Sequence, residues 1–341
     1  MRVAVATVQV PFVAGGAEIL AQGLVTALRS AGHPTELVTL PFRFFPVTEV
    51  ERAMRAWADE DFTQLNLYEP DVVICLKFPS YALRHPRKVA WLLHQHRDAY
   101  DLARADAPPA LKACAQQIKA FDDRHLRGLQ RFTISARVSA RLQEFNALAS
   151  TPLYHPPREP ERFYGGDAMP YIFVPSRLES AKRQELLVRA MATVSAPVGA
   201  LLAGEGGQYG YLRDLIGELG LQSRVRLLGA ASWDLMRSLY ARSLAVFFGP
   251  RDEDYGYVTL EAILSHKPVI TCTDSGGPLE FVVDGATGRV VAPEPAAIAD
   301  AINRLWADRA RARQMGEAGY ARYQALDIRW DHVVARLLEA T

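Results

Sequence analysis

What this sequence lacks excludes several kinds of protein. Its three cysteines, Cys75, Cys114 and Cys272, lie far apart and show no C-x-x-C spacing, which excludes a disulfide framework and a zinc site of ordinary spacing. No apolar run approaches the roughly 18 residues of a membrane-spanning helix. The opening residues, MRVAVATVQV, also lack the features of a signal peptide. We therefore expect a cytoplasmic protein, at most peripheral at the inner face of a membrane.

An excess of charge of either sign is also missing. The 39 Lys and Arg residues nearly balance the 38 Asp and Glu residues, so the chain has no general attraction for nucleic acid, and we expect no such partner. The apolar fraction of 49% is ordinary for a folded protein. At 341 residues the chain is longer than one average domain, which favours two domains.

Short β-branched runs alternate with amphipathic stretches along the chain, which is typical of βαβ units that build a parallel sheet. In the first half we predict strands at residues 3–8, 35–40, 72–76, 89–93 and 132–134, and helices at 17–31, 111–122 and 136–147. In the second half we predict strands at residues 171–175, 198–203, 225–228, 245–248 and 268–273, and helices at 184–193, 211–219, 233–241 and 258–265, with three more after residue 294.

A segment rich in proline and glycine, residues 151–170, interrupts this alternation and predicts a linker. The domains that we expect are an N-terminal Rossmann-like domain at 1–155, a linker at 156–170, a C-terminal Rossmann-like domain at 171–325, and a C-terminal helix at 326–341 that packs back on the first domain. Such folds bind ligands at the carboxyl ends of their parallel strands. A cleft between the two sheets is therefore the expected site.

The most informative stretch, residues 249–278, carries Glu253 in a loop and Glu261 in the helix that follows. If the helix begins near Gly256, its rise separates Glu261 from the loop by only about 8 Å. Carboxylate oxygens accept hydrogen bonds from vicinal hydroxyls, so the two residues suit a ribose and a sugar ring of one ligand. Gly256 lets backbone amides approach that ligand at a helix start.

The stretch EDYGYVTLE resembles the E-x7-E region of the family 4 retaining glycosyltransferases, which have the GT-B fold. This resemblance implies a nucleotide-sugar donor, with Glu253 on the sugar hydroxyls and Glu261 on the ribose. Tyr255, Gly256 and Tyr257, which lie between the two glutamates, are then candidate donor-binding residues. Asp254 stands where the family usually has glycine.

Two other interpretations of this stretch are open. Glu253 could be a solvated loop residue and Glu261 an ordinary exposed carboxylate of a helix. Alternatively, Asp252 and Asp254 could form a D-x-D site for a divalent cation. We favour the interpretation in which both glutamates bind one ligand, because they occur in a strand, a loop and a helix that match the family region. We expect no metal site.

Two cations point to a phosphate site. Arg177 follows a predicted strand and Lys182 precedes a helix, so both can reach a diphosphate at the carboxyl end of the sheet and neutralise a leaving group. Their spacing matches the R-L-x-x-x-K motif of the same family. The alternative is a pair of surface cations that flank a helix.

The first half offers weaker signals. Gly15 and Gly16 lie between a strand and a helix in VQVPFVAGGAE, where bare amides could approach the donor, and the family commonly has this loop. His94 follows another strand and aligns with a family histidine, with His96 as the second candidate. Either pattern could also be structural, as a simple turn or as a buried histidine at a strand end.

Further glycines in the second half are ambiguous. Gly276 and Gly277 resemble a family loop near the donor, but a strand-to-helix turn explains them equally well. The strand that ends at Gly229 matches a family strand whose end lies near the nucleobase. The loop GEGGQYG at 204–210 is too generic to be interpreted as a phosphate loop.

These features together predict a retaining glycosyltransferase that moves a sugar from a nucleotide-sugar donor to a hydroxyl of a glycan, a lipid-linked acceptor or a small molecule. The resemblance implies no cofactor and independence from metal ions. A phosphorylase, a hydrolase or an epimerase of the same fold remains an alternative, as does a non-catalytic nucleotide-binding module. A dinucleotide oxidoreductase is disfavoured because no G-x-G-x-x-G follows the first strand.

Overall fold

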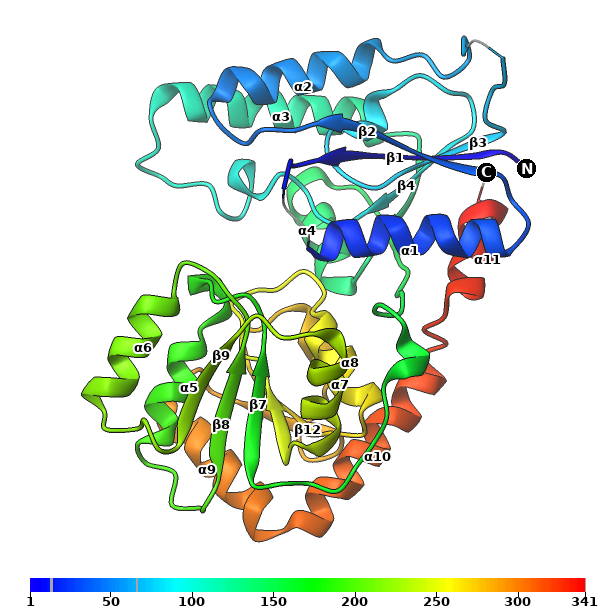
Figure 1. The fold of residues 1–341 in the computed structure, drawn as a ribbon. Coiled ribbons are helices and arrows are strands. Elements are labelled where there is room, and N and C mark those ends of the chain that lie inside the picture. Colours follow the sequence, from blue (N-terminus) through cyan, green and yellow to red (C-terminus); the bar gives the residue numbers. More distant parts are fainter. Residues whose placement is uncertain (13–14, 66, 341) are drawn as a thin grey trace. The chain divides into compact units, whose positions relative to one another are not determined.

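The computed structural model describes residues 1–12, 15–65 and 67–340 and divides the chain into two compact units (Figure 1). Unit 1 comprises Met1–Arg158 together with the chain from Ile328 onwards, and unit 2 comprises Glu159–Asp327. Both units are α/β structures with a parallel sheet, as the alternating pattern predicts. Of the motif VQVPFVAGGAE, residues 13–14 lie outside the described part.

The sheet of unit 1 has six strands in the order β2-β1-β3-β4-β5-β6. The strands are β1 (Val3–Gln9), β2 (Thr35–Pro41), β3 (Val72–Cys75), β4 (Lys88–Leu92), β5 (Gln130–Thr133) and β6 (Thr151–Pro152). The chain order reverses between β1 and β3, so the loops after these two strands diverge to opposite sides of the sheet. Ligands of such sheets bind at that point, at the carboxyl ends of the strands.

Helices cover both faces of this sheet, with α2 and α3 on one side and α1 and α11 on the other (Figure 1). The α-helices of unit 1 are α1 (Gly16–Ser30), α2 (Val47–Asp59), α3 (Pro109–Leu126), α4 (Ala136–Asn146) and α11 (Trp330–Glu339). Short 3-10 turns follow β3 and β4, at η1 (Ser80–Ala82) and η2 (Arg97–Ala99).

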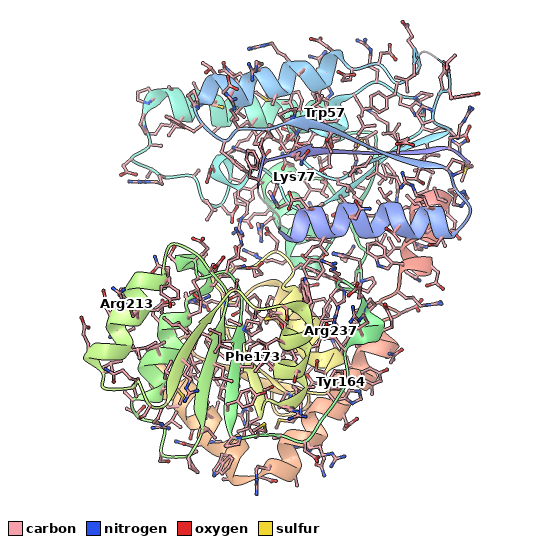
Figure 2. All side chains as sticks on the ribbon, viewed as in Figure 1. Trp57, Lys77, Tyr164, Phe173, Arg213 and Arg237 are labelled. Carbon is pink, nitrogen blue, oxygen red and sulfur yellow. The ribbon has the colours of Figure 1, made fainter. Side chains whose placement is uncertain are left out.

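The sequence pattern did not predict helix α2. Five of the 13 residues of VTEVERAMRAWAD are charged, and its buried apolar stripe is narrow and consists of Val50, Met54 and Trp57. These residues lie four and then three positions apart, on one face of the helix, and all three are buried. Trp57, labelled in Figure 2, is 1% exposed, which makes α2 an integral part of the core despite its weak signal.

The C-terminal helix α11 belongs to unit 1 and packs against α1. Val333, Val334 and Leu337 of α11 are buried. Gly23 of α1 has no side chain at the point where the indole of Trp330 lies, and a Cβ there would collide with the ring. Trp330 also contacts Trp91 edge-on, which ties α11 to the central strand β4.

The sheet of unit 2 has the order β12-β11-β10-β7-β8-β9. Its strands are β7 (Tyr171–Pro175), β8 (Gly199–Ala203), β9 (Val225–Gly229), β10 (Ala245–Phe247), β11 (Val269–Cys272) and β12 (Gly288–Val291). Counted from β7, this is the 3-2-1-4-5-6 order of the Rossmann fold, in which the ligand lies outside the carboxyl ends of the first and fourth strands. Those two strands are β7 and β10.

Helices of unit 2 also flank the sheet, with α5 and α6 on one side and α7 and α8 on the other (Figure 1). The α-helices are α5 (Gln184–Met191), α6 (Tyr209–Glu218), α7 (Trp233–Arg242), α8 (Tyr257–Leu264), α9 (Pro295–Ala307) and α10 (Arg309–Ala325), with 3-10 turns at η3 (Pro160–Arg162), η4 (Ser180–Lys182) and η5 (Gly277–Glu280). Phe173 of β7 is fully buried and lies in the interior of the unit (Figure 2).

Two strands at sheet edges, β6 and β12, were also not predicted, and β6 is only two residues long. No helix in the described part of the chain combines the length and the apolar character that a membrane crossing requires.

The packing of α11 leads to a stability prediction. Leu337 is 0% exposed, so Leu337→Ala should leave a cavity and lower the free energy of unfolding of unit 1 by about 2–4 kcal/mol. The neighbouring half-buried Leu338 provides the control, since Leu338→Ala should cost clearly less. Denaturant unfolding followed by tryptophan fluorescence measures both, and equal losses would contradict a structural role for this face of α11.

Candidate functional site

Loops from four strands of unit 2 meet at the carboxyl edge of its sheet. They follow β7 (residues 176–183), β8 (204–206), β10 (249–256) and β11 (274–277). The loops after β7 and β10 leave the sheet at the point where the chain order reverses, which is where Rossmann-type sheets bind ligands. They also carry Arg177, Lys182 and Glu253, three of the residues that the sequence predicts to act on the ligand.

The glycines of the loop after β8 serve close packing. The amide of Leu178 donates to the Glu205 carbonyl at 2.9 Å, and the amide of Gln208 donates to the Leu178 carbonyl at 2.9 Å. Gly204 (φ +145°) and Gly206 (φ +155°) have backbone conformations that favour glycine, and a Cβ on either would collide with the backbone of residues 176–178. The loop therefore supports the segment that carries Arg177.

The loop after β10 is held on both sides by backbone hydrogen bonds. The Arg251 amide donates to the Ala181 carbonyl at 2.8 Å, which joins it to the loop after β7. The Glu253 amide donates to the Ser275 carbonyl at 2.9 Å, and the Gly277 amide donates to the Glu253 carbonyl at 2.8 Å, which joins it to the loop after β11. These backbone hydrogen bonds thus fix the backbone position of Glu253.

Gly276 and Gly277 allow this close approach. A Cβ on Gly276 (φ +72°) would lie 2.5 Å from the Glu253 carbonyl oxygen, and a Cβ on Gly277 would lie 2.8 Å from the Asp254 carbonyl oxygen. The sequence suggested a ligand loop or a simple turn at these glycines. The structure shows that they are needed where two loops pack backbone against backbone.

Arg183 anchors the same loops and was missed in the sequence. Its guanidinium forms two hydrogen bonds with the carboxylate of Asp274, at 2.7 and 2.8 Å, and donates to the carbonyls of Gly249 at 2.9 Å and Pro250 at 2.8 Å. Hydrogen bonding from Arg183 lowers the pKa of Asp274 below its ordinary value. Next to Lys182 in the chain, Arg183 looked like another surface cation, and no local pattern marks it as an anchor.

Lys182 and Glu253 form an ion pair at the centre of this edge, between the ammonium and a carboxylate oxygen. Their side chains are only 16% and 24% exposed, and the ammonium also lies 5.6 Å from the centre of the Phe248 ring. The structure therefore brings together the predicted phosphate-binding lysine and the predicted sugar-binding glutamate. The two opposite charges balance each other.

Arg177 differs from Lys182 in its surroundings. Its side chain is exposed, and among the residues that the structure describes it makes no hydrogen bond or ion pair. Its backbone, in contrast, is fixed because the buried amide of Gln184 donates to the Arg177 carbonyl at 2.8 Å and to the Ser176 hydroxyl at 2.7 Å. A planar cation on a rigid backbone is thus available to an anion from solvent.

Glu261 is buried, not the exposed helix carboxylate of the alternative interpretation. It is 6% exposed, and the Tyr240 hydroxyl donates to its Oε2 at 2.5 Å. Burial raises the pKa of Glu261 from 4.5 to about 7, against the opposing effects of the Tyr240 hydrogen bond and of the positive charge of Arg237. Tyr240 is a further site residue that the sequence did not reveal.

The other predicted donor-binding residues of unit 2 differ in burial and in the space around them. The ring of Tyr255 is buried and packs edge-on against Tyr257 at 5.6 Å and Phe281 at 5.5 Å. Gly256 (φ +90°) is the N-cap residue of helix α8, and a Cβ there would lie 3.0 Å from both the Phe248 ring and Pro278. Gly229, half-exposed at the end of β9, has φ +67° and open space around it.

The site residues predicted in unit 1 lie at the carboxyl ends of β1 and β4. The Gly15 amide donates to the carboxylate of Glu18 at 2.8 Å, and Gly16 opens helix α1. His94 is half-buried, whereas His96 is 9% exposed and packs among Phe42, Phe44 and Phe78. Burial lowers the pKa of His96 to about 4, so its imidazole is neutral at pH 7 and has the character of a core histidine.

In the described part of the chain, no three His, Cys, Asp or Glu side chains are grouped in a way that could hold a metal ion. The carboxylate of Glu253, central to the alternative D-x-D interpretation, is directed to Lys182. Chemically, the carboxyl edge of unit 2 offers two cations for a diphosphate and a carboxylate for hydroxyl groups, at the position where such sheets bind ligands.

Comparison with known proteins relates the chain to sugar-transferring enzymes. The profile described as "Glycosyl transferases group 1" matches residues 162–322, which fall inside unit 2. Alpha-D-kanosaminyltransferase of Streptomyces kanamyceticus is 30% identical over 45% of this chain and 41% of its own length. A GDP-mannose-dependent alpha-(1-6)-phosphatidylinositol monomannoside mannosyltransferase of Mycolicibacterium smegmatis is 28% identical over 98% of this chain and 89% of its length. The chain spans about two fifths of the first two curated relatives, 41% and 40%.

Solved structures resemble the whole chain. Sucrose-phosphate synthase from Thermosynechococcus elongatus superposes with a TM-score of 0.79 over 99% of this chain and 98% of its own, at 20% identity. Anabaena HepE in complex with UDP and glucose gives 0.72 over 100% of both chains, at 19% identity. These likenesses confirm the expected GT-B fold class with its two parallel sheets.

The contact between the loops after β10 and β11 can be tested with Gly276→Ala. The new methyl group would lie 2.5 Å from the Glu253 carbonyl oxygen, so overpacking of about 1–3 kcal/mol should add to the left-handed backbone penalty of about 1 kcal/mol. Gly285 is the matched control, because its φ of +71° is nearly the same but no atom lies within 4 Å. Denaturant unfolding should show a clearly larger loss for Gly276→Ala, and equal losses would sink the packing explanation.

Burial of Glu261 predicts a pH dependence. A pKa raised from 4.5 to about 7 on folding stabilises the folded state fully below pH 4.5, and this stabilisation is lost as the pH rises through 7. Glu261→Gln, which stays neutral, should therefore gain roughly 1–3 kcal/mol relative to the native protein between pH 4.5 and about 8. Urea unfolding at both pH values measures this difference, and a constant difference would contradict a neutral buried carboxyl.

Proposed function

We propose that this chain, whose residues 162–322 belong to the group 1 glycosyl transferases, moves a sugar from a nucleotide-sugar donor to a hydroxyl of an acceptor with retention of configuration. The observation that supports this most directly is the arrangement of Arg177, Lys182 and Glu253 at the reversal point of the unit 2 sheet. All three lie within the segment that matches the family.

The two cations would hold the donor diphosphate. Arg177 is exposed on a fixed backbone and can meet a phosphate without breaking an existing contact. Lys182 pairs with Glu253 in the free protein, and the more highly charged diphosphate would replace that carboxylate as its partner. Binding of the donor would thereby free Glu253 to accept hydrogen bonds from sugar hydroxyls.

The reaction breaks the bond between the anomeric carbon and the diphosphate oxygen, and a bond from that carbon to the acceptor oxygen forms on the same face. The acceptor proton passes to the departing diphosphate, so no carboxylate nucleophile is needed. Negative charge grows on the diphosphate as the bond breaks, and Arg177 and Lys182 stabilise it because they are already in position. Glu253 orients the sugar at the reacting carbon.

The nucleoside would occupy the remaining predicted positions in unit 2. Tyr240 holds one carboxylate oxygen of Glu261, which leaves the other as an acceptor for ribose hydroxyls. The open backbone at Gly229 would lie near the base, and Tyr255, Gly256 and Tyr257 would shape the binding site between the glutamates. In this proposal, donor binding needs no metal ion.

We assign the acceptor to unit 1. Of the candidates at the carboxyl ends of its strands, Gly15 and Gly16 would bind the donor through their backbone amides, and His94 would help to position the sugar. The acceptor class is a hydroxyl-bearing glycan, lipid-linked glycan or small molecule. The names of two relatives include compounds of two of these classes, the lipid phosphatidylinositol monomannoside and the small molecule D-inositol 3-phosphate.

Thermal denaturation with UDP-, GDP-, ADP- and TDP-sugars, with and without Mg²⁺, tests the proposal, because a ligand of the folded state raises the melting temperature. We expect one nucleotide to give a shift that Mg²⁺ does not change. Arg177→Ala should then reduce sugar transfer or donor hydrolysis by about 100-fold or more without lowering stability. Arg213→Ala, an exposed arginine of α6 (Figure 2), is the charge-matched control.

Full activity of Arg177→Ala would sink the assigned role of this arginine. If no nucleotide sugar changed the melting temperature while inorganic phosphate did, a phosphorylase would be favoured. If nucleotides bound but no sugar moved to any acceptor or to water, the non-catalytic nucleotide-binding module would replace the transferase.

A further inference from the structure

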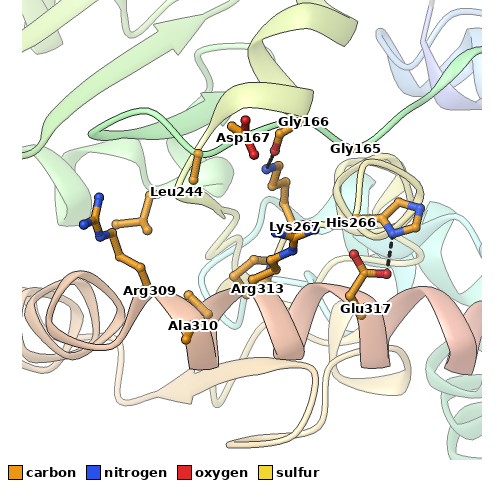
Figure 3. Close-up of a pocket in the computed structure, with 13 residues that line it drawn as sticks. Gly165, Gly166, Asp167, Leu244, His266, Lys267, Arg309, Ala310, Arg313 and Glu317 are labelled. Carbon is orange, nitrogen blue, oxygen red and sulfur yellow. Dashed lines mark hydrogen bonds and ion pairs between the residues drawn. The ribbon is translucent and has the colours of Figure 1, made fainter.

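Unit 2 also contains a cavity at the other end of its sheet, with a volume of about 770 Å³ (Figure 3). Leu244 and Lys267, which precede β10 and β11, line it, so it lies at the amino ends of strands whose carboxyl ends form the proposed donor site. The segment at 165–168 and the first turns of α10 complete the wall. Its volume falls in the range of small-molecule sites, roughly 300–1,000 Å³.

The walls of the cavity are held in place by close contacts. The Lys267 ammonium donates to the Gly166 carbonyl at 2.6 Å, and His266 Nδ1 lies 2.8 Å from a carboxylate oxygen of Glu317. The His266 ring stacks on Tyr320 at 4.3 Å. Gly316 of α10 lies against the His266 carbonyl, where a Cβ would collide. A preformed wall reduces the entropy cost of ordering residues around a ligand.

Three cations from two segments face this space. Arg309 and Arg313 lie four residues apart on α10, so they project from the same side of the helix, and both are exposed. Lys267 is only 6% exposed. Among the described residues, Arg313 makes no hydrogen bond or ion pair. Arg313 therefore adds a positive charge to the cavity, and no described residue of the wall forms an ion pair with it.

Charged groups of both signs surround Lys267. Burial, together with a smaller effect of the positive charge of Arg313, lowers the pKa of Lys267 to about 8. The negative charges of Asp167 and Glu317 act in the opposite direction. An anion between Lys267 and Arg313 would offset the repulsion between these two cations.

We propose that this cavity binds a small phosphate monoester that carries hydroxyl groups. The phosphate would lie between Arg313 and Lys267, with Arg309 at its entrance, because guanidinium and ammonium groups form strong charge-assisted hydrogen bonds to phosphate. The carboxylate of Asp167 and the backbone carbonyls of the 165–168 segment would accept hydrogen bonds from the hydroxyls. This site is separate from the donor site, and the inference does not depend on the proposed transferase activity.

Isothermal titration calorimetry of the full chain with ribose 5-phosphate, inorganic phosphate and ribose as probes tests the proposal. We expect ribose 5-phosphate to bind more tightly than inorganic phosphate, and ribose to bind least. Arg313→Ala and Arg309→Ala should each weaken ribose 5-phosphate binding, with the double variant weakened by about tenfold or more. Both positions are exposed, so the variants should retain the native melting temperature.

One control separates this site from other sources of binding. Arg311→Ala removes the same charge from the same helix outside the cavity lining, so it should bind ribose 5-phosphate like the native protein. Unchanged binding by the Arg309 and Arg313 double variant would overturn the proposal. So would an equal loss in Arg311→Ala, or equal affinity for ribose 5-phosphate and inorganic phosphate.

Discussion

The Arg183 guanidinium joins segments of unit 2 that are far apart in the sequence. It forms hydrogen bonds with the carbonyls of Gly249 and Pro250 and with the carboxylate of Asp274, from a residue whose own φ is +53°. A left-handed backbone costs an arginine about 1 kcal/mol, which these charge-assisted hydrogen bonds offset. With this anchor in place, the loops after β7, β10 and β11 hold a fixed geometry.

This constraint explains why the ion pair of Lys182 and Glu253 can form at the edge of the sheet. Lys182 precedes Arg183 in the chain, and Glu253 follows the carbonyls that Arg183 binds. Backbone hydrogen bonds on both sides of Glu253 then limit the directions in which its side chain can extend. Preorganisation of this kind lowers the cost of reorganising charged groups when a ligand arrives or reacts.

The two ends of the unit 2 sheet are built in different ways. At the carboxyl edge, loops pack backbone against backbone at Gly204, Gly276 and Gly277. The charged side chains of these loops are therefore not needed for the packing and can contact a ligand. At the amino ends of β10 and β11, the turn at His266 and Lys267 packs against α10, and cations line a cavity. One sheet thus positions charged groups at both of its ends, and the length of its strands separates them.

Much of the architecture could be predicted from the sequence alone. The alternation of β-branched runs with amphipathic stretches reports the parallel sheets, because burial of both faces requires continuously apolar strands. Helix α2 and strand β6 were not predicted because a narrow apolar stripe and a run of two residues give little periodic signal, and strand β12 was missed as well. The spacing of Glu253 and Glu261, and that of Arg177 and Lys182, identified candidate site residues by resemblance.

Only the tertiary structure decided what those residues contact. The sequence does not show that Lys182 pairs with Glu253 across 71 positions, that Glu261 is buried against Tyr240, or that Arg183 rather than its neighbours anchors the loops. Local sequence patterns determine which segments become strands and helices, since these depend on nearby residues. Burial, pairing and pKa depend on groups that only the fold brings together, and therefore no local pattern contains them.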